Sequence, residues 1–488
     1  MKPSGIYAAA LHSTSIYAVG IVLSRAVSIL LLPLYTRYLT ASDYGILELV
    51  DVTMTVFALV VGARVSNAVA YFCAKANSEL EKSTVYTTNL IGSTLATFFA
   101  VVVGWMLSSR LGAQILGVPG SSEIFRLGVV GFALSFPAES FLARLRVENR
   151  PVYFISIQLA RLFLAMGLNV YLIVVAHLGF RAILWSNIVC NLVISAYGAF
   201  VTFRSCRTGF SSPLFLAMLK FAVPVGAVGL SLFVFHVADR FFLRRYSTLA
   251  EIGLYSLGYK LGMLITYAGM AFSQYWSAQS YEMLKGERGP AVFSRVFTYF
   301  LAVVLLAAVA TWVFAAPALQ ILTTAEFRSC IVFVPWIIVA YLFRLVAEYL
   351  RAVLYTSQRP GLDAIVNSSS AVFCLLAYWL LIPRYGAMGA AWATASTSVV
   401  MLILSAFYSR RVFPVRFEPK PVAVLSAGAA AVVALQRLFP TPNLPLQLLS
   451  GAVACALFLG VVVWFGAIGS GDRQKIQAVV RARFASAS

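Results

Sequence analysis

Apolar stretches about twenty residues long recur along this chain of 488 residues and leave little sequence between them. A helix needs about 20 predominantly apolar residues to cross the hydrocarbon core of a bilayer. Fourteen stretches meet that requirement, and they lack the alternation of membrane β-barrel strands. The predicted spans are 13–35, 44–72, 86–108, 123–143, 152–176, 180–203, 214–239, 252–277, 291–316, 331–356, 361–382, 387–409, 420–438 and 446–467. The sequence therefore predicts an all-α integral membrane protein with about 14 transmembrane helices.

The charged residues indicate which ends of these spans face the cytoplasm. Charged residues make up only 11% of the chain, against about 25% in a typical soluble domain. With a cytoplasmic N-terminus, 20 of the 37 Lys and Arg residues fall in cytoplasmic segments and 9 in the opposite segments. Because cytoplasmic loops of membrane proteins are enriched in Lys and Arg, we expect both termini in the cytoplasm and an even number of spans. The net charge of +20 thus reflects membrane topology, and no nucleic-acid partner is expected.

The chain also resembles itself at an offset of about 208 residues. Segment 37–45 (RYLTASDYG) matches segment 245–253 (RYSTLAEIG), and Asn149-Arg150-Pro151 matches Gln358-Arg359-Pro360. Further along, Gly179 and Trp185 match Gly386 and Trp392. A unit with an even number of spans keeps its orientation when it is repeated. The repeat therefore predicts two parallel six-helix lobes plus two C-terminal helices.

The predicted domains follow from this repeat. Residues 1–210 form the N-terminal lobe with spans 1–6, residues 211–415 form the C-terminal lobe with spans 7–12, and residues 416–488 hold spans 13 and 14 and a short basic cytoplasmic tail. Parallel duplicated bundles are a transporter architecture, in which the two lobes rock against each other around a central substrate path. The alternative is an old duplication that is kept for packing alone.

Ionisable side chains inside the spans are candidates for the substrate site, because charge at membrane depth is costly and usually faces a protein or aqueous interior. The candidate substrate-binding residues of a cationic cavity are Arg25, Arg64, Lys260, Arg161 and Arg344. The candidate ion-coupling residues or charge partners are Glu48, Asp51, Asp239 and Glu348. A cationic cavity favours an anionic substrate. The competing interpretation is structural pairing, as for Arg344 with Glu348 one helical turn later.

Motifs for enzymatic chemistry are missing from the sequence. It contains no P-loop, no H-E-x-x-H and no G-x-S-x-G motif, and its three His and six Cys residues lack metal-ligand spacing. We therefore expect a transporter and not an enzyme, with no metal and no cofactor, and with Na⁺ or H⁺ coupling as the candidate energy source. A membrane polysaccharide polymerase or ligase is disfavoured, since no loop is large enough to carry a catalytic site.

Segment 32–46 (LPLYTRYLTASDYGI) resembles the first loop of Wzx-type polysaccharide flippases, which belong to the multidrug/oligosaccharidyl-lipid/polysaccharide exporter (MOP) superfamily. The second copy at Arg245–Gly253 and the Asn149-Arg150-Pro151 turn fit this resemblance, and in span number and loop size it covers essentially the whole chain.

The resemblance implies a bacterial inner-membrane flippase that moves an undecaprenyl-pyrophosphate-linked oligosaccharide to the outer leaflet for cell-surface polysaccharide biosynthesis, for example O-antigen or exopolysaccharide. It implies membrane lipid and other polysaccharide-assembly membrane proteins as partners. The alternatives are a lipid II flippase, which shares this plan, and an ion-coupled drug or metabolite antiporter of the same superfamily. The antiporter would need a more acidic cavity and twelve spans.

Overall fold

The structure is a computed structural model, and its described residues form helices joined by short connections, with no strand among them. The described residues are 31–60, 65–206, 209–270, 272, 276, 289–357, 359–415, 417–439 and 443–464, with side chains throughout except at 58–60 and 224–232. This confirms the predicted all-α fold.

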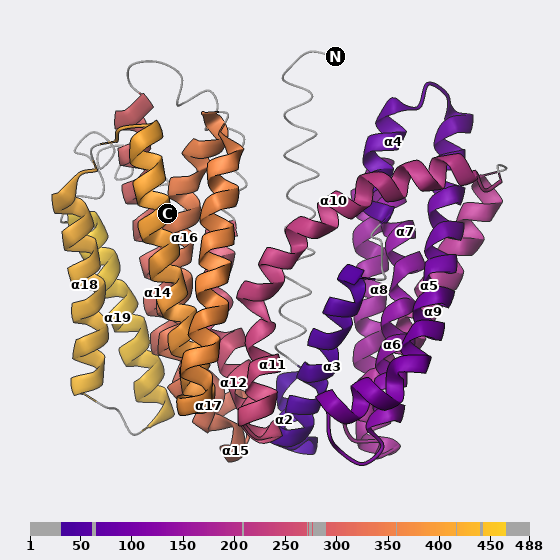
Figure 1. Cartoon of the computed structure of the whole chain (residues 1–488). Coiled ribbons are helices and arrows are strands. Elements are labelled where there is room, and N and C mark those ends of the chain that lie inside the picture. Colours follow the sequence, from indigo (N-terminus) through magenta and orange to yellow (C-terminus); the bar gives the residue numbers. More distant parts are fainter. Residues whose placement is uncertain are drawn as a thin grey trace, which may run out of the picture. The chain divides into compact units, whose positions relative to one another are not determined.

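The chain divides into two compact units, Met1–Gly253 and Leu254–Ser488, and each unit is a helical bundle (Figure 1). The elements of unit 1 are α2 (Leu32–Tyr38), α3 (Ala41–Val60), η1 (Val65–Ala68), α4 (Val69–Lys75), α5 (Glu79–Ile115), α6 (Ser121–Ala133), α7 (Ser135–Val147), α8 (Pro151–Val170), η2 (Tyr171–Val175), α9 (Arg181–Ser205), α10 (Ser212–His236), α11 (Ala238–Tyr246) and the first turn of α12 (Leu249–Gly262). Unit 2 holds the rest of α12 and then η3 (Met263–Ile265), α14 (Gly289–Leu322), α15 (Ala325–Arg328), η4 (Ser329–Val332), α16 (Val334–Thr356), α17 (Pro360–Val412), α18 (Pro419–Leu438) and α19 (Leu444–Trp464). The predicted domain boundaries after residues 210 and 415 stay a prediction.

The helices have the length and surface of membrane spans. Among the described residues, eight helices are long and apolar enough to cross a bilayer, or nine if the pair Ala325–Val332 and Val334–Thr356, bent by 45°, counts as one span. Large apolar side chains are exposed along them, for example Met106 (75% exposed) and Phe98 (72%) on α5. Such a surface needs lipid around it. The chain is thus an integral membrane protein, while the count of fourteen spans stays a prediction.

Predicted spans 361–382 and 387–409 are both contained in α17, which reverses direction at Gly386. Gly386 has φ 55° and ψ −135°, a conformation that only glycine adopts easily. Tyr378 precedes Gly386 and Thr394 follows it. Their hydroxyl groups lie 3.4 Å apart although the two residues are sixteen positions apart in the sequence. A straight helix would place them about 24 Å apart, since it rises about 1.5 Å per residue. Residues 360–412 therefore form an antiparallel helical hairpin.

Matched positions of the internal repeat adopt the same backbone conformation. Gly179 has φ 56°, close to the 55° of its counterpart Gly386. Arg150 (φ −107°, ψ 68°) and Arg359 (φ −118°, ψ 56°) precede the prolines that begin α8 and α17. Each donates its backbone N–H to the carbonyl oxygen five residues earlier, over 3.1 and 2.8 Å. The repeat read from the sequence is therefore also a repeat of local structure.

Each of the two matching segments, 37–45 and 245–253, contains a threonine that caps the helix that follows it. At the start of α3, Asp43 N donates to Thr40 Oγ1 (3.1 Å) and Thr40 N donates to Asp43 Oδ2 (3.0 Å), which is a reciprocal capping box. At the start of α12, Glu251 N donates to Thr248 Oγ1 (3.2 Å). Each threonine thus satisfies one of the backbone N–H groups that a helix start leaves without a partner.

Helices α18 and α19 lie outside the repeat and side by side on α14 of unit 2 (Figure 1). Gly451 of α19 is close enough to Phe314 of α14 that an added Cβ would lie 3.0 Å from the ring. Small residues allow such close approach between membrane helices, where packing and not hydrophobic exclusion drives association.

Candidate functional site

The basic residues predicted for the cationic cavity are only partly described. Arg25 and Arg64 lie outside the described residues. Lys260 lies on α12 with an exposed side chain. Arg161 lies on α8, half-buried, and forms no ion pair with any residue that the structure describes. The cavity as a set therefore stays a prediction, whereas the acidic candidates and Arg344 can be followed in detail.

In unit 1, the predicted acidic residues Glu48 and Asp239 meet at Arg240. Arg240 Nη1 donates to Asp239 Oδ1 (2.8 Å) and Oδ2 (3.0 Å), and Arg240 Nη2 lies 3.7 Å from Glu48 Oε1. The side chains of Glu48, Asp239 and Arg240 are 7%, 0% and 2% exposed. We call these three residues the Arg240 cluster. Asp51, one turn beyond Glu48 on α3, is exposed.

Helix α11 brings the Arg240 cluster together. The backbone breaks at Val237 (φ −145°, ψ −13°), and α11 then begins with Asp239 in its first turn, where the helix dipole favours a negative charge. Arg240 Nη1 also donates to His236 O (2.8 Å) across this break. On the same helix, Arg244 donates to Ile115 O (2.7 Å) and Leu116 O (2.9 Å) at the C-terminal end of α5. Two arginines therefore anchor α11 within unit 1.

The sequence analysis missed Arg240, because span 214–239 ended one residue before it and the following segment was treated as a loop. The structure shows a helix there, with Arg240 among the largest fully buried side chains. The internal repeat contains the information that would have identified this helix. Helix α2 at residues 32–38, shifted by 208, gives 240–246, which falls inside α11. The internal repeat thus locates this helix better than hydropathy does.

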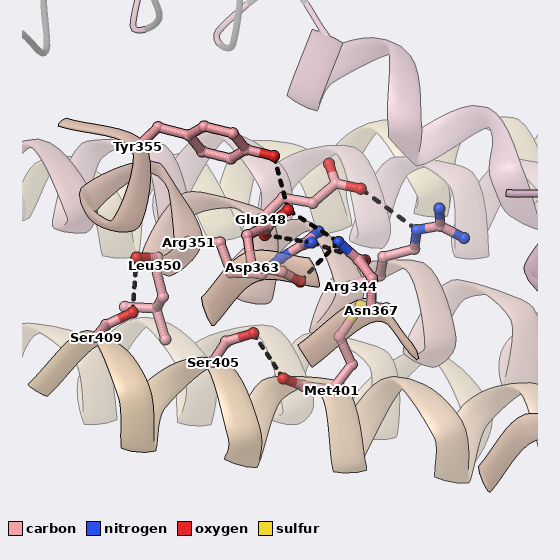
Figure 2. A network of polar contacts seen from close by, with 10 residues as sticks. All are labelled: Arg344, Glu348, Leu350, Arg351, Tyr355, Asp363, Asn367, Met401, Ser405 and Ser409. Carbon is pink, nitrogen blue, oxygen red and sulfur yellow. Dashed lines mark hydrogen bonds and ion pairs between the residues drawn. The ribbon is translucent and has the colours of Figure 1, made fainter. Parts of the chain in front are cut away.

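In unit 2, Arg344 and Glu348 form the predicted pair, with Arg344 Nε 3.3 Å from Glu348 Oε1 (Figure 2). A second group of polar contacts lies further along α16 and joins it to α17. Arg351 Nη1 donates to Asp363 Oδ1 (2.9 Å) and to Asn367 Oδ1 (2.8 Å). Tyr355 Oη donates to Asp363 Oδ2 (2.6 Å). We call these six residues the α16–α17 network.

Asp363 is the centre of the α16–α17 network. Its carboxylate accepts from Arg351, Tyr355 and Asn367 Nδ2 (2.9 Å), so three side chains from two helices hold it in place. Arg351 lies near the end of predicted span 331–356, yet its side chain is only 12% exposed and pairs with Asp363 (8% exposed). Charge-assisted hydrogen bonds of this kind offset the cost of burying both ions.

The charges of the α16–α17 network balance, since two guanidinium groups face two carboxylates (Figure 2). Arg344, which was predicted to contribute to a cationic cavity, is compensated by Glu348. This part of unit 2 therefore has little net attraction for a multiply charged anion.

The fold of the chain is that of membrane transporters. The structure aligns with the lipid II flippase MurJ in an inward closed conformation over 91% of this chain and 98% of that one, with a TM-score of 0.70 and 13% sequence identity. It aligns with an inward-facing MATE family multidrug resistance transporter of the MOP superfamily over 82% and 98%, with a TM-score of 0.63 and 13% identity. A MOP superfamily transporter from Pyrococcus furiosus gives 0.57 at 15% identity, over 82% and 96%. These are transporter folds and not enzyme folds, as predicted.

The sequence then defines the family within this class. Residues 10–274 match the family described as Polysaccharide biosynthesis protein, which is more than half of the chain. The chain belongs to this polysaccharide biosynthesis family. It is also 27% identical over 288 residues to protein 1 of the Lsg locus of Haemophilus influenzae. That alignment covers 56% of this chain and 66% of the relative, so the chain spans just under two thirds of the relative's length.

Proposed function

We propose that this protein is a flippase that moves an undecaprenyl-pyrophosphate-linked oligosaccharide from the cytoplasmic to the outer leaflet of the bacterial inner membrane. The observation that carries the proposal is the combination of a polysaccharide biosynthesis family match with a fold similar to that of a lipid II flippase. Polysaccharide precursors built on the cytoplasmic side have to cross the bilayer, and a two-unit transporter fold can expose a site to either side in turn. Other membrane proteins of polysaccharide assembly are the expected partners.

The proposed site binds the pyrophosphate through the basic residues Arg25, Arg64 and Lys260, with Arg161 as a further candidate. Guanidinium and ammonium groups replace the water that the phosphates lose when they leave the cytoplasm. The lipid tail stays in the bilayer while the head group passes through the protein. In this mechanism Arg344 pairs with Glu348 in the α16–α17 network, and the other basic residues bind the pyrophosphate.

Orientation and energy source complete the proposal. The Lys and Arg distribution supports cytoplasmic termini, which places the loops at Arg150 and Arg359 on the cytoplasmic side. Glu48, Asp51, Asp239 and Glu348 are the acidic residues that an inward Na⁺ or H⁺ gradient would act on. Glu48 and Asp239 share one guanidinium group in the buried Arg240 cluster, so a coupling ion would have to compete with Arg240 for their carboxylates.

The first test is a flipping assay in proteoliposomes with fluorescent undecaprenyl-pyrophosphate glycan. We expect flipping by the wild type and a loss of about tenfold or more in Arg25→Ala, Arg64→Ala and Lys260→Ala, because each removes a charge-assisted contact to phosphate, of about 1.5–3 kcal/mol. The matched control is Lys420→Ala, which removes an exposed positive charge at the start of α18 and should flip normally. Export of an organic cation in place of glycan flipping would identify an antiporter, and flipping of lipid II alone would identify a lipid II flippase.

Energy coupling is tested in the same vesicles with imposed gradients. We expect an inward Na⁺ or H⁺ gradient to raise the flipping rate, and the isosteric variants Asp51→Asn and Glu348→Gln to show which acidic residue responds to it, since a neutral amide cannot exchange an ion. A flipping rate that is the same with and without both gradients would contradict ion coupling.

A further inference from the structure

A pocket of about 270 Å³ opens beside the α16–α17 network in unit 2. It is lined by residues of α14, α16 and the start of α17, and by Gly269, Phe272 and Trp276. Its volume lies just below the range of roughly 300–1,000 Å³ that is typical of small-molecule sites. The pocket can therefore hold a ligand of about one or two rings, but not a long glycan.

Several aromatic side chains line the pocket. Trp276 and Tyr349 stack with their ring centroids 5.4 Å apart and their planes 18° apart. Phe300 stacks on the same Tyr349 at 5.1 Å and 21°, and Phe272 lies 6.0 Å from Trp276 at 23°. Several ring planes thus run nearly parallel. The face of an aromatic ring is electron-rich and attracts positively polarised hydrogens, such as the C–H groups on one face of a pyranose.

Polar side chains also line the pocket. Glu348, Arg351, Tyr355 and Asp363 line it, and all four belong to the α16–α17 network (Figure 2). Two buried donors of pocket residues, Trp276 Nε1 and Arg351 Nε, have no hydrogen-bond partner among the described residues. A buried donor without a partner costs about 1–3 kcal/mol, so these groups favour a ligand that brings hydrogen-bond acceptors.

Charge decides which class of ligand fits this pocket. In the α16–α17 network, Arg344 balances Glu348 and Arg351 balances Asp363. A pyrophosphate group would require net positive charge, and an organic cation would require net negative charge. A neutral ring with hydroxyl groups requires neither. It needs an apolar face to stack on and donors and acceptors at its edge, and this pocket offers both.

We infer that this pocket binds one sugar ring of the transported glycan. The inference rests on the proposed flippase function and adds that the sugar and the pyrophosphate are bound by different residues. Under the predicted orientation, Tyr355 and Asp363 flank the cytoplasmic loop at Arg359, so the pocket lies where a substrate from the cytoplasm enters. Aromatic residues contact the apolar face of the ring, and the α16–α17 network hydrogen-bonds its hydroxyl groups.

The test uses the full-length protein in nanodiscs and saturation-transfer NMR. The probes are glucose, galactose, mannose, rhamnose, N-acetylglucosamine and N-acetylgalactosamine, with inorganic pyrophosphate and tetramethylammonium as charged controls. The variant Ala352→Phe fills the pocket without changing a charge, because Ala352 lines it. The matched control is Ala427→Phe at an exposed position of α18. We expect saturable binding of at least one sugar, weakened about tenfold or more in Ala352→Phe and unchanged in Ala427→Phe.

Two results would overturn the sugar pocket. One is the absence of binding for all six sugars in folded protein. The other is equal sugar binding and equal glycan flipping by Ala352→Phe and the wild type. Failure of the proposed function is a separate outcome, in which no lipid-linked glycan is flipped by the wild type while sugars still bind and Ala352→Phe still weakens them. That result would leave the pocket as a sugar site of a different transporter.

Discussion

Arg240→Met is expected to destabilise the protein by about 3–5 kcal/mol, because it leaves the carboxylates of Glu48 and Asp239 buried without their guanidinium partner. Methionine fills a comparable volume, so the loss of charge and not a cavity dominates the effect. The measurement is the unfolding midpoint in detergent, by heat or by denaturant. The control is Arg245→Met on the same helix, where the side chain is exposed and the midpoint should barely change.

Neutralising the carboxylates should reverse much of this loss. In the triple variant Arg240→Met, Glu48→Gln and Asp239→Asn, no buried charge of the Arg240 cluster remains, and we expect most of the stability to return. A triple variant as unstable as Arg240→Met alone would show that packing around Arg240, and not its charge, stabilises unit 1. A single variant as stable as the wild type would contradict the structural role of the cluster altogether.

Features of the sequence that depend on local chemistry were predicted well. The repeat matched Gly386 with Gly179, and Gly386 lies at the reversal between predicted spans 11 and 12 with φ 55°. Its repeat partner Gly179 has nearly the same φ of 56°, at which a residue with a side chain would be strained. The pairing of Arg344 with Glu348 follows from their spacing of four residues on one helix. In each case a few neighbouring residues determine the outcome.

Features that depend on how helices cross were not predicted. The α16–α17 network was not predicted, because Arg351 and Asp363 lie on different helices and meet only when α16 and α17 pack against each other. A hydropathy reading locates the spans but not their contact faces.

The contact between the two copies of the motif is also invisible in the sequence. At Gly45, an added Cβ would collide with Leu249 O, and at Gly253 it would collide with Ala41 O. Shifting 41 and 45 by 208 gives 249 and 253, so the two contacts are symmetric copies of each other. The starts of α3 and α12 therefore cross backbone against backbone, with each motif glycine facing the other copy.

Gly45→Ala and Gly253→Ala are accordingly expected to destabilise the protein by about 3 kcal/mol each, since backbone atoms cannot move aside as a flexible side chain would. The matched controls are Gly167→Ala and Gly460→Ala. These glycines also lie in helices, but an added Cβ would meet nothing within 4 Å, so their unfolding midpoints should stay the same or rise slightly. The double variant should lose less than the sum of the single losses, because either methyl group alone already separates the crossing. Equal midpoints for all four single variants would mean that the helices do not approach this closely, whereas strictly additive losses would mean that the two glycines act at separate contacts.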